Sequence, residues 1–206
     1  TTLDLSNWNT SAFTGSTSGQ TFYGMNNITS VNITGWDVSN ITQAVSWFEV
    51  SGNSGAGFTL TAPNLNWSSC TTLSKFFFRC HMTSANVSNW TLNSSGISIS
   101  QMFRGIGEIP VATGGLNLDL STWVNTGSVN SLSSLFLISR GLSSVNITNW
   151  DLSHITDFTT MFSSCYFLEE IIGLDTQRWD SATNMDRAFY QLYRIKFDSN
   201  NFHDDF

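Results

Sequence analysis

The segment Val31-Asn-Ile-Thr-Gly-Trp-Asp-Val-Ser-Asn-Ile-Thr42 returns 114 residues later as Val145-Asn-Ile-Thr-Asn-Trp-Asp-Leu-Ser-His-Ile-Thr156, with nine of the twelve positions identical. Weaker copies lie between and around these two segments. They are marked by tryptophans at a mean spacing of 28.5 residues, namely Trp8, Trp36, Trp67, Trp90, Trp123, Trp150 and Trp179. Because four such spacings make 114 residues, the sequence predicts tandem repeats of about 28 residues.

Each repeat has two halves with different hydrophobic periodicity. Ahead of the tryptophan, apolar residues alternate, as in Val31 and Ile33, which is typical of a short strand. After it, Ile41, Ala44 and Phe48 fall at helical spacing, and the pattern recurs over residues 129–136 and 155–162. An eighth strand is expected over residues 193–202.

One strand and one helical return per repeat predict an α/β solenoid of leucine-rich-repeat type. We expect a parallel sheet on one face, short helices on the other, about seven to eight repeats, and one domain over residues 1–206. The fixed place of Trp and Phe within the repeat favours internal ladders over exposed stacking platforms. Trp47 is the tryptophan outside this series, so exposure at a rim stays open for it.

The composition excludes several functional classes. Charged residues make up 11% of the chain, whereas Ser, Thr and Asn account for 75 of the 206 residues. With 8 basic and 15 acidic residues the net charge is -7, which does not suit a surface that tracks nucleic-acid phosphates. No run of 18 apolar residues occurs, so direct insertion into a membrane is not expected. The chain begins at Thr1 within a patterned segment, and we expect a fragment of a longer protein.

Outward-facing strand positions are the candidate binding residues. If the alternating apolar residues point inward, their neighbours point outward from the sheet. The middle row comprises Asp4, Asn32, Thr59, Asn86, Asp119 and Asn146. The outer row comprises Ser6, Thr34, Thr61, Ser88, Ser121 and Thr148. Two interpretations stay open: short polar side chains that hydrogen-bond along the stack, or a neutral lattice of donors and acceptors that binds sugars or a protein backbone.

Two further motifs carry a family resemblance. The segment Leu3-Asp-Leu-Ser-Asn-Trp8 and the later Met161-Phe-Ser-Ser-Cys165 resemble the BspA-like repeats, leucine-rich repeats of surface proteins from Mycoplasma, gut bacteria and some protists. The resemblance covers nearly the whole chain. It implies a secreted or surface-anchored protein that adheres to host cells, matrix or other cells, and it carries over no catalytic residue.

Candidate chemistry is sparse. Cys70, Cys80 and Cys165 are expected to be three unpaired, mostly buried thiols, because separate repeats or a helical run hold them beyond disulfide reach. The terminal run His203-Asp204-Asp205 lacks a spaced set of metal ligands. No nucleophile elbow, phosphate loop or zinc-protease motif occurs. We therefore expect no catalytic residue, no metal and no cofactor.

Nine Asn-x-Ser/Thr sequons occur, but a Ser and Thr content of 27% produces several by chance. The sequons at Asn32, Asn86 and Asn146 recur with the strand motif and need no sugar to explain them. The turn residues Asn27 and Asn40 are better glycan acceptors.

The sequence thus predicts a non-enzymatic, extracellular adhesion or recognition module at the cell surface. Its partner would be a protein or glycan of a host or neighbouring cell, bound by many weak polar contacts and multivalent display. The alternative is a structural subunit whose open ends stack copies of the chain end to end into a fibre or layer.

Overall fold

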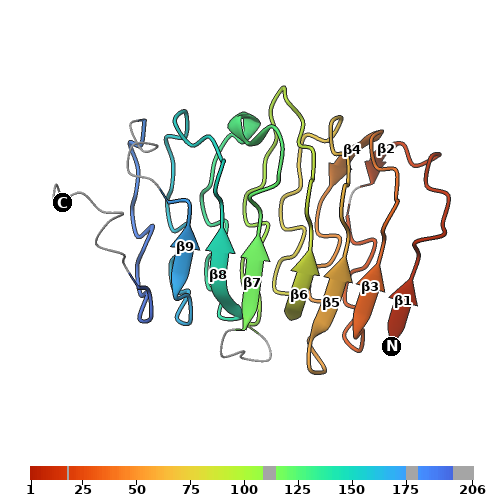
Figure 1. The fold of residues 1–206 in the computed structure, drawn as a ribbon, viewed down its shortest axis with the longest axis horizontal. Coiled ribbons are helices and arrows are strands. Elements are labelled where there is room, and N and C mark those ends of the chain that lie inside the picture. Colours follow the sequence, from red (N-terminus) through yellow and green to blue (C-terminus); the bar gives the residue numbers. More distant parts are fainter. Residues whose placement is uncertain (18, 109–114, 175–180, 197–206) are drawn as a thin grey trace.

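A computed structural model describes residues 1–17, 19–108, 115–174 and 181–196, and it shows a parallel β-solenoid (Figure 1). Seven main strands lie side by side along the solenoid and point in the same direction (Figure 1). They are β1 (Thr2–Asp4), β3 (Ser30–Asn32), β5 (Phe58–Thr61), β6 (Met82–Asn86), β7 (Leu116–Asp119), β8 (Leu142–Asn146) and β9 (Glu170–Ile172). Ladder hydrogen bonds join β1-β3-β5-β6 and β7-β8-β9, with every neighbouring pair parallel.

Each coil also contacts the next on its second side. The strands β2 (Gly15–Thr17) and β4 (Ile41–Ala44) pair in parallel there. Single bridges continue this pairing from Gln43 to Thr72 and from Thr72 to Ser98. The described coils are therefore held together by hydrogen bonds on several sides, as the repeat pattern predicted for stacked units.

The prediction of short helices is wrong. Within the described residues the one helical element is the three-residue 3-10 turn η1 (Thr126–Ser128). The amides of the expected helices donate instead to the neighbouring coil: Phe48 N lies 2.8 Å from Phe76 O, and Phe136 N lies 2.9 Å from Met161 O. The fold is thus a solenoid of parallel β-strands and turns, and the α/β leucine-rich-repeat form is not observed.

The helical spacing arose from consecutive tight turns. After β5, the amides of Phe76 and Phe78 donate to carbonyls three residues earlier, those of Leu73 and Lys75. Lys75 and Arg79 have φ angles of 58° and 54°, a left-handed conformation that ends any α-helix. Turns of this kind place apolar residues three and four apart, which a periodicity count cannot distinguish from a helix.

The core contains two columns of aromatic rings among buried aliphatic side chains. The Phe column has successive centroids 4.7–6.0 Å apart and runs through Phe22, Phe48, Phe77, Phe103, Phe136, Phe162 and Phe189. The Trp column includes the stacked pairs Trp90–Trp123 at 5.1 Å and Trp123–Trp150 at 5.8 Å. The prediction of internal aromatic ladders is confirmed for the buried tryptophans Trp36, Trp67, Trp90, Trp123 and Trp150. It does not hold for Trp8, which is 59% exposed, and Trp179 lies outside the described residues.

The Trp column changes its register in the coil that contains β5. The bridge between Asn66 and Thr91 makes Leu65, rather than Trp67, the equivalent of Trp90. The buried ring of Trp47 fills the resulting space, with its centroid 6.4 Å from that of Trp36 and 5.5 Å from that of Trp67. Trp47 is 1% exposed, so it lies in the core and not at a rim.

The same coil corrects one assignment in the polar rows. Thr59 pairs with Ser30, and Thr61 pairs with Asn32, so Thr61 belongs to the middle row and Thr59 does not. Placing Thr59 in the middle row beside Asn32 shifts this coil by two residues. The shift arises because Trp67 follows its strand two residues later than the other tryptophans do.

Two smaller predictions concern the cysteines and the C-terminal strand. Cys70, Cys80 and Cys165 are free and buried, as expected. The expected strand over 193–202 is described only to Lys196, whose amide donates to Glu169 O at 2.9 Å and continues the ladder without a named strand. None of the helices in the described residues is long and apolar enough to cross a membrane.

Candidate binding surfaces

The first candidate surface is the outward face of the main sheet. Within the middle row, Asp4 lies beside Asn32 and Asp119 beside Asn146 on neighbouring strands, as expected. Thr61 takes the place predicted for Thr59 and lies beside Asn86. Asp4, Asn86 and Asp119 are exposed, and Asn32 and Asn146 are half-buried. The outer row is half-buried throughout.

The two rows bind each other within a coil. The Oδ1 atom of Asn32 accepts hydrogen bonds from Thr34 N at 3.1 Å and Thr34 Oγ1 at 2.7 Å. The same Asx turn joins Asp4 to Ser6, Asn86 to Ser88, Asp119 to Ser121, and Asn146 to Thr148. The carboxylate of Asp4 consequently has a pKa below its usual value, because the hydroxyl and amide of Ser6 donate to it. These side chains are therefore fixed in place by bonds within each coil, whereas the structural interpretation of the rows expected hydrogen bonds along the stack.

The Asx turns also explain most of the sequons. In six of the nine, the asparagine Oδ1 accepts from the backbone or side chain of the residue two positions later; these are Asn9, Asn32, Asn66, Asn86, Asn93 and Asn146. The two expected acceptors, Asn27 and Asn40, lie exposed in turns outside this pattern. Their attachment of a glycan stays a prediction.

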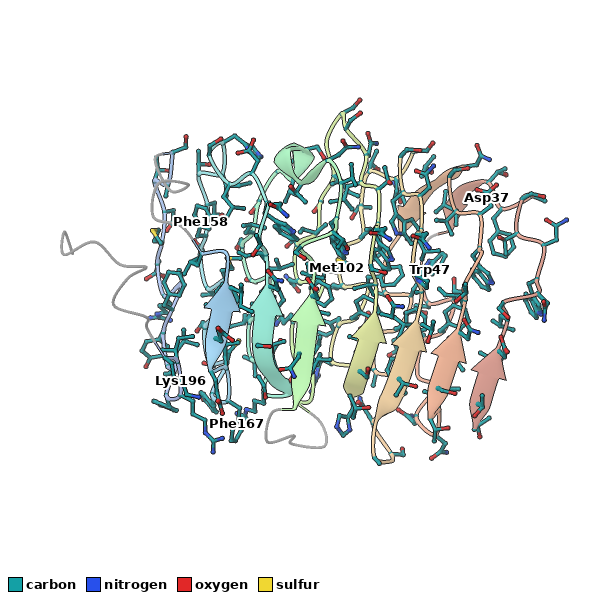
Figure 2. All side chains as sticks on the ribbon, viewed as in Figure 1. Asp37, Trp47, Met102, Phe158, Phe167 and Lys196 are labelled. Atoms are coloured by element: carbon teal, nitrogen blue, oxygen red, sulfur yellow. The ribbon has the colours of Figure 1, made fainter. Side chains whose placement is uncertain are left out.

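The second candidate surface is a cationic edge that the sequence analysis missed. We define the turn segments as the stretches between each second-side bridge and the next main strand and, after the last bridge at Asn184, the stretch up to Lys196. All Lys and Arg of the described residues fall in them: Lys75, Arg79, Arg104, Arg140, Arg187, Arg194 and Lys196. Figure 2 shows Lys196 at the edge where the main strands begin and Asp37 at the opposite edge. These residues are scattered along the chain. Their positions relative to the repeat phenylalanine of each coil would have shown that they belong to the same part of the repeat.

Cations lie against aromatic rings along this edge. The Lys75 ammonium and the Arg104 guanidinium are 5.5 and 5.4 Å from the centroid of Phe78. Farther along, Arg140 lies 4.9 Å from the ring of Tyr166, whose centroid is 5.3 Å from that of Tyr193.

A neighbouring row completes a patch on the last three described coils. Arg194 lies 4.7 Å from the ring of Phe167, which Figure 2 shows at the same edge as Lys196. Lys196 Nζ is 2.8 Å from Glu169 Oε2, and this bond and charge lower the pKa of Glu169 and raise that of Lys196. We call Arg140, Tyr166, Phe167, Tyr193, Arg194 and Lys196 the cation–aromatic patch.

The three cysteines are buried thiols without a disulfide partner. Burial raises the pKa of Cys70 to about 11 and that of Cys165 to about 12, which disfavours the reactive thiolate. The described residues contain no group of three or more His, Cys, Asp or Glu side chains that could hold a metal ion. The run His203-Asp204-Asp205 lies outside the described residues.

One family model matches the chain, over residues 1–113 and again over 111–202. Its description is Mycoplasma protein of unknown function, DUF285, and it represents BspA-like repeats of unknown function. No curated protein and no solved structure matches the chain. The two consecutive matches agree with the tandem coils of the solenoid, and the chain belongs to this Mycoplasma family, DUF285.

Proposed function

We propose that the chain is a non-enzymatic recognition module of an extracellular surface protein, which binds a protein or glycan of a host or neighbouring cell. The observation that supports this function is the outward face of the main sheet. There, Asx turns hold polar side chains in fixed positions at the spacing of the coils, about 4.8 Å. Preorganised donors and acceptors lose little freedom when a ligand binds, so many weak contacts can add up.

Arrays of glycans and matrix proteins test this function with the whole chain as the probe. The variant Thr59→Lys combined with Ser84→Lys places two charged side chains on exposed, adjacent positions of the sheet face. Ser94→Lys, on an exposed turn away from the sheet, is the matched control. Binding that the double variant loses and the control retains supports the sheet face, while silence of the parent chain on both arrays contradicts the proposed function.

One observation favours end-to-end assembly as a second candidate. The outer edge of β1 has no neighbouring strand in this structure, and Trp8, which stacks on Trp36 with centroids 6.4 Å apart, is 59% exposed. An open ladder and an exposed ring suit a further coil or the end of another copy. Light scattering at increasing concentration tests this: growth that Trp8→Ser suppresses supports assembly, and a constant monomer mass contradicts it.

A further inference from the structure

The cation–aromatic patch differs from the rest of this weakly charged surface. No Lys or Arg of the described residues lies outside the turn segments, whereas Asp4, Asp37, Asp119, Asp151 and Asp157 all do. The turn segments hold these seven cations together with Glu49, Glu108, Glu169 and Asp186, so they carry a local excess of positive charge although the net charge of the chain is -7. A local excess of this kind can attract an anionic ligand that the average charge would repel.

Within the patch, the arginines are held in place by the rings beneath them. Arg140 lies over Tyr166 and Arg194 over Phe167, at 4.9 and 4.7 Å from the ring centroids. A guanidinium stacked in this way keeps the N–H groups of its edge available, in the planar fork that matches a carboxylate. Because the ring restricts the side chain, less conformational freedom is lost when an anion binds.

An exposed aromatic ring lies beside these donors. Tyr193 is 70% exposed, and it continues the row of Arg140 and Tyr166 by one coil. Gln191 Oε1 accepts from Ser164 Oγ at 2.9 Å and from the Tyr166 hydroxyl at 3.3 Å, which sets an amide beside the rings. Exposed rings with fixed arginines and amides suit a ligand that has C–H faces, hydroxyls and a negative charge.

We propose that this patch binds a carboxylate-bearing sugar chain, with Arg140 and Arg194 receiving the carboxylates and Tyr193 stacking against a sugar ring. The inference rests on the proposed recognition function and names the ligand class and the site. The coil spacing, about 4.8 Å, is close to the length of one sugar ring, so successive rings of a linear chain can lie on successive coils.

The charge balance of the patch argues against polyphosphates. Glu169 bonds to Lys196 at 2.8 Å and lies 4.0 Å from Arg194, and Glu170 follows it in the chain. Three cations against two carboxylates leave a small local excess of positive charge. Tracking a nucleic acid requires many phosphate contacts, whereas a sugar chain with sparse carboxylates requires only a few.

Calorimetric titration of the whole chain tests this proposal with two carboxylated polymers of different origin, hyaluronan and polysialic acid. Neutral dextran, sulfated heparin, polyglutamate and single-stranded DNA serve as contrasts. We expect at least one carboxylated polymer to bind and to bind more weakly in higher salt. Arg194→Gln should weaken binding by about tenfold or more, and Tyr193→Ala by about threefold to tenfold.

Matched controls lie on other coils of the same edge. Arg79→Gln removes an arginine that is paired with Glu108 at 3.1 Å, and Tyr23→Ala removes a ring that is 46% exposed. Both should leave the affinity unchanged, and Tyr193→Phe should retain it because the ring remains. Unchanged thermal unfolding of the four variants at Arg194, Tyr193, Arg79 and Tyr23 would show that the fold is intact.

The outcomes separate this proposal from the function on which it rests. Equal losses in the patch and control variants overturn the patch as the site. Binding to heparin, polyglutamate or DNA without either carboxylated polymer overturns the ligand class. If neither carboxylated polymer binds while the arrays identify another ligand, the inference is overturned and the recognition function stands. If no ligand binds in either experiment, both proposals are contradicted.

Discussion

The coil that contains β5 and the coils that follow it bury tryptophan in different ways. In the following coils, the indole N–H groups of Trp90, Trp123 and Trp150 donate to carbonyls of the preceding coil at 2.6, 2.8 and 3.0 Å. In the β5 coil, Leu65 holds the equivalent position, and Trp47 and Trp67 fill the core instead. Their buried indole N–H groups have no acceptor among the described residues.

This difference separates two contributions to the core. Ring contact persists in both regions, since Trp47 and Trp67 still lie 5.5 Å apart. The indole hydrogen bond forms where the tryptophan stands five residues after the central residue of its main strand. A shift of two residues abolishes this bond. Aromatic packing therefore persists in an irregular repeat, whereas the hydrogen bond of the indole N–H group is lost.

Removing a ring from the regular column should have the largest effect. Trp90→Ala leaves a cavity among Phe77, Trp67 and Trp123, and we expect a loss of about 3–5 kcal/mol in the free energy of unfolding. Trp8→Ala removes a ring that is 59% exposed at the first coil and should cost about 1 kcal/mol or less. Denaturant titration measures both, and equal losses would contradict a continuous column.

Replacing single tryptophans with phenylalanine sharpens the comparison. Trp90→Phe removes the bond to Ala62 O, while Trp67→Phe removes an N–H group that has no acceptor. We expect Trp90→Phe to be the more destabilising by about 1–3 kcal/mol in chemical unfolding. If the two variants unfold alike, the indole hydrogen bonds contribute nothing to the regular coils.

The sequence predicted part of this architecture. The recurrence of Trp36 and Trp150 predicted stacked coils, and the alternation around Val31 predicted the main strands with their polar outer face. The helical interpretation failed because tight turns reproduce a three- and four-residue spacing, and because the partner of Phe136 N is a carbonyl 25 residues later, at Met161. A hydrogen bond to another coil leaves no local trace in the chain.

The binding surfaces were foreseen to different degrees. Asx turns follow from the local pattern of Asn32 and Thr34, so the polar rows could be read from the strand motif. The cation–aromatic patch joins Arg140 to Arg194 across two coils, and irregular coil lengths obscured that relation. Only the pairing of coils in three dimensions brings these side chains to one edge.

A smaller effect is expected where β-branched residues occupy the left-handed region. Val50 has a φ of 61°, and Val50→Gly should raise the free energy of unfolding by up to about 1 kcal/mol, because glycine adopts this conformation without strain. The control, Val124→Gly, changes a valine that is 50% exposed and forms the bridge to Thr91. This variant should lower the free energy of unfolding by about 1 kcal/mol. Losses at both positions in thermal unfolding would indicate that Val50 packing outweighs its backbone strain.

The smallest effect concerns the Asx turns that use aspartate. The pKa of Asp37 is lowered because the hydroxyl and amide of Ser39 donate to its carboxylate. A lowered folded pKa gives stability that is present above the unfolded value, near 3.9, and is lost as the pH falls through the folded pKa. Asp37→Asn should keep the turn and flatten this part of the acid-unfolding profile; an unaltered profile would contradict the assignment.

Amide NMR gives the most direct test of hydrogen bonding between coils. A scalar coupling across the hydrogen bond identifies which carbonyl accepts each amide, and the structure places Phe136 N 2.9 Å from Met161 O. The account predicts a coupling from the Phe136 amide to the Met161 carbonyl, one coil away. A coupling to the carbonyl of Leu132, four residues earlier, would establish the α-helix and contradict the β-solenoid.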